Sequence, residues 1–125
     1  MEYSVEFYQK INGEIPVRDF LMSLNPKTRA KAFRDIELLK TYGYMLREPY
    51  TKSIKGKLNS GIYELRIKHS TEISRIFYFS YKDNVFILLN GFIKKTSKTP
   101  SRELEKARKY KEDFERRKHH EKSEY

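Results

Sequence analysis

Arg66, Arg75 and Phe92 stand at spacings that would bring them into one row across a β-sheet. Each lies in a run rich in Ile, Val, Phe and Tyr, which favour strands. The connections between these runs are too short for anything but antiparallel hairpins. A turn at 70–71 places Arg66 opposite Arg75, and a turn at 83–84, where Asp and Asn tolerate left-handed conformations, places Arg75 opposite Phe92.

Two arginines that face each other across a sheet repel unless an anion lies between them. Guanidinium groups bind phosphate oxygens in pairs, and an exposed ring stacks on a base, so Arg66, Arg75 and Phe92 together suit a nucleotide. Lys94 lies two residues beyond Phe92 on the same face. The alternative is that Glu64, two residues from Arg66, neutralises that arginine while Arg75 is solvated.

Six lysines flank the row in two groups. One group lies between the last strand and the last helix, near a helix N-terminus whose free N–H groups favour anions, and the other precedes the first of the three strands. The groups are Lys94, Lys95 and Lys98, and Lys52, Lys55 and Lys57. Residues 44–100 hold 11 basic and four acidic side chains, so most of the net charge of +10 lies there. Charge concentrated on one part of a fold attracts phosphate-rich partners.

The composition excludes several kinds of site. There is no cysteine, which excludes thiolate metal sites and cysteine nucleophiles. The five glycines are scattered and form no phosphate-binding loop, and the acidic residues form no cluster for two-metal nuclease chemistry. His69 is predicted in a turn, and His119 and His120 in a C-terminal tail, so paired histidine acid–base catalysis is not expected. We therefore expect neither a metal nor a cofactor.

The N-terminal third predicts one strand and two helices. Residues 3–8 alternate in polarity as a strand does, and the apolar spacing from Pro16 predicts a short helix. Asn25 and Pro26 predict the cap and first turn of a second helix, which Gly43 ends. The apolar face predicted for this second helix consists of Ala30, Phe33, Ile36 and Leu39.

The rest of the chain predicts a β-meander and a last helix. Residues 44–61 form a connection with at most a short strand near 54–58. The predicted strands are 62–68, 73–81 and 85–94, and the last helix begins at 99–100 with the apolar stripe Leu104, Ala107, Tyr110 and Phe114. The predicted fold is α+β, an antiparallel β-sheet with two N-terminal helices packed on one face and a C-terminal helix. We expect one domain over 1–118 and a disordered polar tail over 119–125.

The longest apolar run, at 85–89, is far shorter than a membrane span requires. The first residues show no charged-then-apolar signal pattern. We therefore expect a cytoplasmic protein with no membrane association.

Three segments together resemble a known family. Ile-Tyr-Glu-Leu-Arg at 62–66, Ser-Arg-Ile-Phe-Tyr-Phe at 74–79, and Leu-Leu-Asn-Gly-Phe-Ile-Lys-Lys-Thr-Ser-Lys-Thr-Pro at 88–100 resemble the phage-derived HigB-like branch of the RelE/ParE toxin superfamily. The resemblance spans roughly residues 1–115. It implies a RelE-like fold and the toxin of a type II toxin–antitoxin system, a metal-independent endoribonuclease that cuts mRNA on the ribosome by 2′-hydroxyl attack. It also implies a HigA-like antitoxin with a helix-turn-helix, in a complex expected to be a heterotetramer.

The resemblance also assigns roles by position. Arg66 and Arg75 would hold the scissile phosphate and stabilise the charge that builds on it. Phe92 would stack on a base, and a lysine would contact phosphate or protonate the leaving 5′-oxygen. The resemblance implies a catalytic set of Arg66, Arg75 and Lys95. It implies an RNA-binding set of Phe92, Lys94, Lys98, Lys55 and Lys57. Better-studied members carry Tyr or His where Phe92 stands, so Glu64 and a lysine of lowered pKa are both candidates for the general base.

Two other functions are compatible with the sequence. A ParE-like inhibitor of DNA gyrase belongs to the same superfamily and cuts no RNA. A non-catalytic RNA-binding module would use the same basic sheet face.

Overall fold

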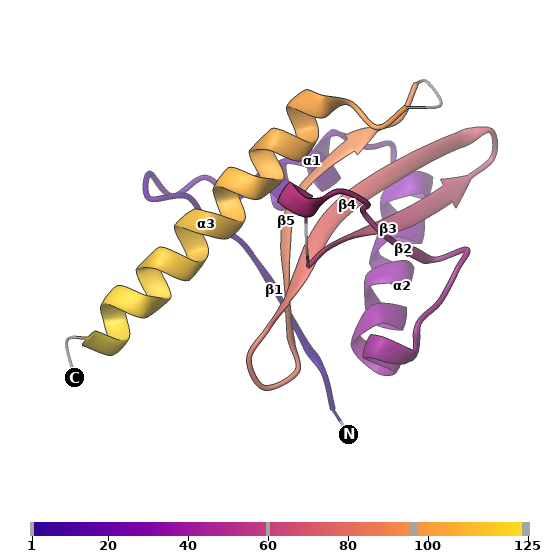
Figure 1. Ribbon diagram of the computed structural model, residues 1–125. Coiled ribbons are helices and arrows are strands. Elements are labelled where there is room, and N and C mark those ends of the chain that lie inside the picture. Colours follow the sequence, from indigo (N-terminus) through magenta and orange to yellow (C-terminus); the bar gives the residue numbers. More distant parts are fainter. Residues whose placement is uncertain (1, 60, 96–97, 124–125) are drawn as a thin grey trace.

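The computed structural model describes residues 2–59, 61–95 and 98–123, which form a five-stranded sheet flanked by three α-helices (Figure 1). The strand order is β1-β5-β4-β3-β2, with β1 parallel to β5 and the other neighbours antiparallel. The strands are β1 Ser4–Phe7, β2 Thr51–Ser53, β3 Ile62–His69, β4 Glu72–Tyr81 and β5 Val85–Ile93; the helices are α1 Pro16–Ser23, α2 Pro26–Tyr42 and α3 Ser101–Ser123. The predicted α+β fold is confirmed.

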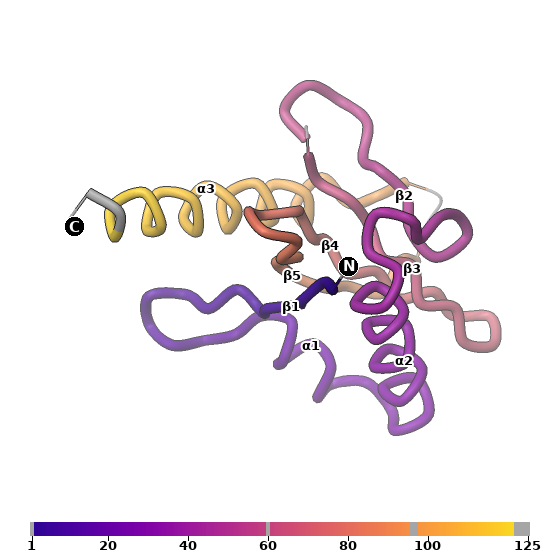
Figure 2. Tube along the Cα trace, turned by 90° about the horizontal axis from the view of Figure 1, so that it is seen from below, coloured from indigo at the N-terminus to yellow at the C-terminus, as the bar shows by residue number. Residues whose placement is uncertain are grey.

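The helices lie on both faces of the sheet, as Figure 2 shows. Successive side chains of a strand point to opposite faces of the sheet, and in the central strands the side chains on both faces are largely apolar. Both faces must therefore be covered. Ile76 and Leu88 belong to the core beneath α1 and α2, whereas Phe77 and Phe79 belong to the core beneath α3. The N-terminal helices share one face as predicted, and α3 covers the opposite face, which the sequence pattern did not assign.

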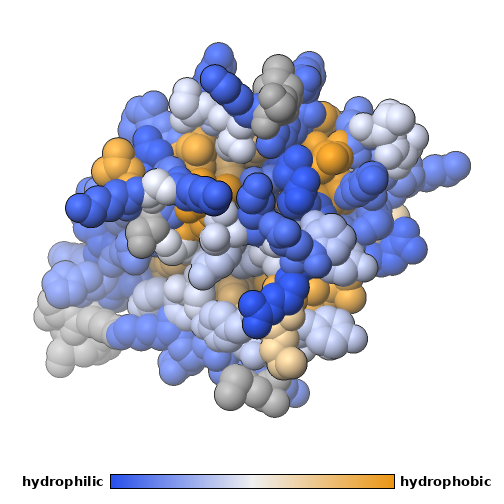
Figure 3. All heavy atoms as spheres, turned by 45° about the vertical axis from the view of Figure 1, so that its right-hand side comes forward, coloured by the Kyte–Doolittle hydropathy of each residue, from blue (hydrophilic) through white to orange (hydrophobic). Residues whose placement is uncertain are grey.

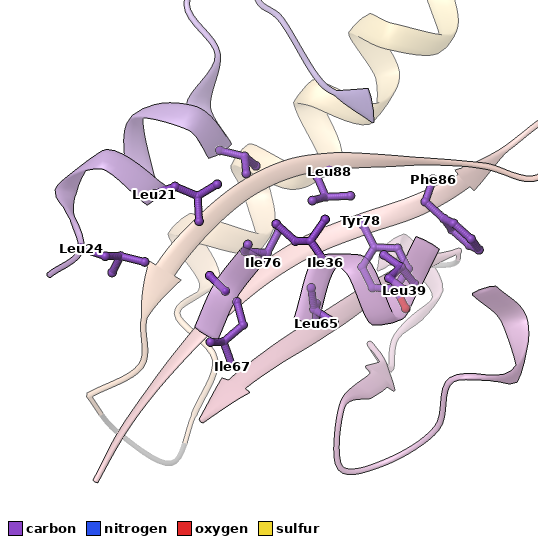
Figure 4. Packing of buried hydrophobic residues seen from close by; sticks show 12 residues of the cluster. Leu21, Leu24, Ile36, Leu39, Leu65, Ile67, Ile76, Tyr78, Phe86 and Leu88 are labelled. Atoms are coloured by element: carbon purple, nitrogen blue, oxygen red, sulfur yellow. The ribbon is translucent and has the colours of Figure 1, made fainter. Parts of the chain in front are cut away.

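The core beneath α1 and α2 is built from residues of five elements, the two helices and strands β3, β4 and β5 (Figure 4). Leu21 from α1 and Leu39 from α2 belong to one cluster with Leu65 and Leu88 of the sheet, and all four are at most 1% exposed. Burial of each such side chain contributes about 1.5–3 kcal/mol to folding. This core holds the sheet that carries the row of Arg66, Arg75 and Phe92.

Local signals set both ends of α2. The Asn25 side chain accepts a hydrogen bond from the Thr28 backbone N–H at 2.9 Å, and Pro26 begins the helix. Gly43 ends it with a φ of 53°, a conformation that favours glycine. The ring of Tyr3 also lies against Gly43, since a Cβ there would be 2.3 Å from the ring.

The apolar face predicted for α2 is partly wrong. Ile36 and Leu39 are buried, but Ala30 and Phe33 are exposed. The buried face continues instead through Thr28, Ala32 and Asp35. Asp35 is tolerated there because Lys31 Nζ lies 2.6 Å from its Oδ1.

The first hairpin, β3–β4, has the predicted register, with His69 opposite Glu72. The second, β4–β5, differs at two places. Tyr81 pairs with Val85, so the loop has three residues, 82–84, and not two. A bulge then leaves Leu89 unpaired, because Phe77 and Tyr78 pair with Asn90 and Leu88. The longer loop and the bulge shift the register in opposite directions, so beyond the bulge Arg75 pairs with Phe92 as predicted.

The connection before β3 forms its short strand at Thr51–Ser53, and the prediction of 54–58 is wrong. This strand pairs with 63–65 at the edge of the sheet, while 57–59 form a 3₁₀ turn. Backbone pairing with β3 fixes its position, and the side chains of so short an edge strand show no period.

The last helix packs through the predicted stripe. Ala107 and Phe114 are buried, and Leu104 and Tyr110 pack partly buried beside them. The helix continues to Ser123, so 119–123 of the predicted disordered tail are helical, and residues 124–125 lie outside the described residues. Salt bridges three and four residues apart, such as Lys118 to Glu121, favour this extension.

The surface in Figure 3 is mostly hydrophilic, with hydrophobic side chains in small separate areas. Among the helices described, none has a stretch long and apolar enough to cross a membrane.

Candidate functional site

The predicted row is present. Arg66 lies opposite Arg75 across β3 and β4, and Arg75 lies opposite Phe92 across β4 and β5. The row lies on the α3 side of the sheet, since Phe92 belongs to the same core as Ala107 and Phe114 of α3. Hairpin register therefore gathers these three residues.

Arg75 is neutralised by Glu64. Arg75 Nη1 donates a hydrogen bond to Glu64 Oε1, and the two residues are 5% and 2% exposed. The alternative arrangement, with Glu64 neutralising Arg66 and Arg75 solvated, does not occur. Glu64 is diagonal to Arg75 on the same face, within reach of a long side chain. The Nε of Arg75 is buried without a hydrogen-bond partner among the described residues.

Arg66 differs from Arg75 in its surroundings. It is half-buried, and no described carboxylate forms a salt bridge with it. Its backbone N–H donates to the Tyr50 carbonyl at 2.8 Å, which holds this part of β3 against the connection after α2. Its guanidinium is thus available for an added anion.

A cavity of about 330 Å³ opens beside these residues, and we call it the basic cleft. The walls come from β2 and the residues after it, β3, β4, the residue after β5, and the start of α3. Its charged lining comprises five cations and one carboxylate: Lys52, Lys55, Arg66, Arg75, Lys94 and Glu64. Five cations around a single acid create a positive potential that favours a strongly anionic group such as phosphate.

Lys94, at one side of the basic cleft, has a lowered pKa. Burial lowers its pKa from 10.5, and the positive charges of Arg75, Arg66 and Lys52 lower it further, while Glu64 acts in the opposite direction. Its backbone N–H donates to the Ile73 carbonyl at 3.1 Å, which fixes the chain just beyond β5. A lysine whose pKa is lowered by these neighbours transfers its proton more readily than an ordinary lysine.

Phe92 is not the exposed ring that the sequence led us to expect. It is 8% exposed and packs 5.2 Å from the ring of Phe77, within the core beneath α3. Helix α3 covers this end of the sheet, which buries the ring. A base cannot stack on Phe92 in this structure, so the exposed-ring prediction is corrected.

The remaining predicted lysines divide into two groups. Lys55 lines the basic cleft together with Lys52. Lys57, Lys95 and Lys98 are exposed and do not line it. Residues 96–97 of the lysine-rich connection lie outside the described residues.

The histidines lie away from the basic cleft. His69 Nδ1 is 3.1 Å from Thr28 Oγ1, which ties β3 to the start of α2. His119 and His120 are exposed on α3. Within the described parts of the chain, no group of three or more His, Asp or Glu side chains could hold a metal ion.

One wall of the basic cleft was missed from the sequence. Thr99, just before α3, and Leu104, in the first turn of α3, both line it. The sequence signal that could have revealed this wall was the predicted helix start at 99–100. Because it follows Lys94 by only a few residues, the helix must begin close to the row of Arg66, Arg75 and Phe92. Asn90 Nδ2 also ties β5 to α3, donating to the Glu103 carbonyl at 3.1 Å.

Comparison with solved structures defines the fold class. The structure is similar to a chain of the crystal structure of the archaeal RelE–RelB complex from Pyrococcus horikoshii OT3, with a TM-score of 0.51 and 21% sequence identity. The match covers 73% of this chain and 93% of that chain. The predicted RelE-like fold is confirmed.

Comparison with family models defines the family. Residues 19–112 match the model described as "Phage derived protein Gp49-like (DUF891)". The chain therefore belongs to the Gp49-like family of phage-derived proteins. No curated protein matches the chain significantly.

Proposed function

We propose that this protein is the toxin of a type II toxin–antitoxin system and acts as a metal-independent endoribonuclease on ribosome-bound mRNA. Its family and its RelE-like fold support the proposal. The observation that carries it is the basic cleft, where Arg66 has no salt-bridge partner among the described residues and lies beside four further cations. Such a cleft suits a phosphodiester held for reaction.

The proposed reaction is attack of the 2′-hydroxyl on the adjacent phosphate. The 2′-oxygen loses its proton and bonds to phosphorus, the bond to the 5′-oxygen breaks, and that oxygen gains a proton. The products are a 2′,3′-cyclic phosphate and a 5′-hydroxyl. Arg66 holds the phosphate and stabilises the charge that builds on it. Glu64, oriented by Arg75, accepts the proton of the 2′-hydroxyl.

We assign the proton donor to Lys94 and not to Lys95. Lys94 lines the basic cleft and has a lowered pKa because of burial and neighbouring cations, whereas Lys95 is exposed outside it. Lys95 and Lys98 then serve as contacts to more distant phosphates.

The proposal includes a partner and a location. The neighbour of similar fold comes from a RelE–RelB complex, and we assign this chain a HigA-like antitoxin with a helix-turn-helix, in a heterotetramer. The toxin acts in the cytoplasm, where ribosomes are. An adjacent reading frame with a helix-turn-helix pattern would support this pairing.

The test is induced expression followed by mapping of transcript 5′ ends. New ends confined to translated messages are expected, and they should disappear with Arg66→Ala. DNA-damage signalling with intact transcripts would favour a ParE-like gyrase inhibitor and contradict the proposal. Growth arrest with neither effect would favour an RNA-binding module that does not cut.

A further inference from the structure

A second and larger cavity lies on the opposite face of the sheet, beside the same edge strand. Its volume is about 580 Å³, and it is bounded by β2, the starts of β3 and β5, the end of β4 and the connection after α2. Four aromatic residues line it: Tyr44, Tyr63, Tyr78 and Phe86. We call it the aromatic cavity.

The aromatic walls are fixed in place before any ligand binds. The hydroxyl groups of Tyr78 and Thr51 are hydrogen-bonded at 2.7 Å in the interior. Tyr63 stacks on Tyr78 with ring centres 5.7 Å apart and planes 25° apart, and Tyr44 packs edge-on against Phe86 at 5.2 Å. Rings that are already ordered lose little conformational entropy when a ligand stacks on them.

Two of these rings also reach solvent. Tyr63 is 38% exposed and Tyr44 is 53% exposed, although both pack against buried rings. Each therefore presents surface on which a planar ligand can stack. Phe92, buried beneath α3, presents no such surface.

The aromatic cavity and the basic cleft share three lining residues. Lys52, Ser53 and Lys55 line both cavities, so the two cavities adjoin each other at the sheet edge formed by β2 and the residues that follow it. The aromatic cavity adds Arg47 at its rim, against one carboxylate, Glu48. The rim is thus net cationic, which favours a ligand that carries phosphate groups.

We propose that the aromatic cavity binds the base of an RNA nucleotide that flanks the scissile phosphate. Tyr63 and Tyr44 stack with the base, and Lys52 and Lys55 contact the phosphates that link it to the basic cleft. This inference rests on the proposed function and identifies the aromatic residues that Phe92 does not provide. Stacking is tolerant of sequence, so it positions the RNA without selecting one base strongly.

The test is binding of a fully 2′-O-methylated RNA hexamer, which lacks the attacking hydroxyl and so is not cut. Its affinity is measured by fluorescence anisotropy for the wild-type chain and for Tyr63→Ala, Tyr44→Ala and Lys94→Ala. Loss of one stacked base should weaken binding by about fivefold to 100-fold. Tyr63→Phe should retain wild-type affinity, because the ring and not the hydroxyl carries the contact. Tyr42→Ala is the matched control, since Tyr42 is 51% exposed and lines neither cavity.

A second measurement places the base directly. The chain has no tryptophan, so Tyr63→Trp introduces a single tryptophan in the aromatic cavity, whose emission is distinguished from that of the tyrosines. Its fluorescence should be quenched as the hexamer binds, with the same midpoint as the anisotropy. If Tyr63→Ala and Tyr44→Ala bind like the wild type while Lys94→Ala binds weakly, the aromatic subsite is wrong and the basic cleft stands. If the wild type does not bind the hexamer, the subsite is wrong, and the mapping of transcript 5′ ends still decides the proposed function by itself.

Discussion

Arg75 donates a hydrogen bond to Glu64 from the neighbouring strand, and both side chains are almost fully withdrawn from solvent. The arginine directly opposite Arg75, Arg66, has no such partner in the described structure. Arg75 is therefore held in an ion pair that orients a carboxylate, while Arg66 is available to an anion. The two arginines, alike in sequence context, should respond differently to substitution.

Arg75→Met should lower the free energy of unfolding by about 3–5 kcal/mol, because it leaves Glu64 buried without a compensating charge. The double variant Glu64→Gln/Arg75→Met removes the stranded charge and should recover most of that loss. Urea denaturation of the two variants and the wild type measures both effects. Equal losses in the single and double variants would show that the two side chains are not coupled.

Lys94→Met should reduce cleavage of ribosome-bound mRNA by about 10²–10⁴-fold, because the leaving 5′-oxygen loses its proton donor. Lys95→Met removes the same charge from the next residue, which lies outside the basic cleft, and should slow cleavage far less, because it removes only a contact to a more distant phosphate. Rates of 5′-end formation in a reconstituted translation mixture give the comparison. Similar losses in both variants would assign Lys94 no special role.

Gly91→Ala should destabilise the protein by about 1–3 kcal/mol through overpacking. A Cβ at Gly91 would lie 2.4 Å from the ring of Phe20, on the side of β5 that faces α1. The glycine therefore lets α1 lie close to the sheet. Adding Phe20→Leu should restore part of the melting temperature. A melting temperature unchanged by Gly91→Ala alone would contradict the packing described.

The attachment of α3 should weaken in acid. Burial by itself would raise the pKa of Asp113, but hydrogen bonds from Tyr8, at 2.6 Å, and Arg117, at 2.7 Å, together with the charge of Arg117, lower it below 3.8. Burial, and next the bond to Asp113, raise the pKa of Tyr8 to about 12, so Tyr8 remains a donor at neutral pH.

A carboxylate whose pKa is lowered in the folded state stabilises that state above its unfolded pKa, and this contribution is lost as pH falls through the folded pKa. Asp113→Asn should therefore cost about 1–3 kcal/mol at pH 7, a value typical of charged hydrogen bonds. The difference from the wild type should shrink as pH falls below about 3.8. Thermal melts from pH 7 to pH 2.5 test this, and a constant difference would contradict it.

The row of Arg66, Arg75 and Phe92 was predictable because local turn chemistry sets the register of a hairpin. The turn near Asp83 and Asn84 indicated the second hairpin, and both residues have the left-handed φ that it requires, at 56° and 62°. The loop is one residue longer than predicted, and the bulge at Leu89 restores the pairing of Arg75 with Phe92. No local signal revealed the bulge, so the agreement beyond it depends on two compensating differences.

The burial of side chains was less predictable, because it depends on contacts distant in sequence. Phe92 is covered by α3, and no pattern within β5 shows which face that helix takes. On α2, Ala32 and Asp35 face inward in place of Ala30 and Phe33, a small rotation that periodicity alone does not resolve. The aromatic cavity likewise depends on the connection after α2 folding against Tyr63 and Tyr78.

The most direct test of the central claim is the single-turnover rate of mRNA cleavage on purified ribosomes by Arg66→Ala. Lys82→Ala, which removes an exposed cation from the β4–β5 loop, serves as the control. Removing one group that stabilises the transition state costs about 10²–10³ in rate, so Arg66→Ala should fall by that factor while its melting temperature stays near that of the wild type. Cleavage by Arg66→Ala at the rate of Lys82→Ala would contradict the assignment of the basic cleft as the catalytic site.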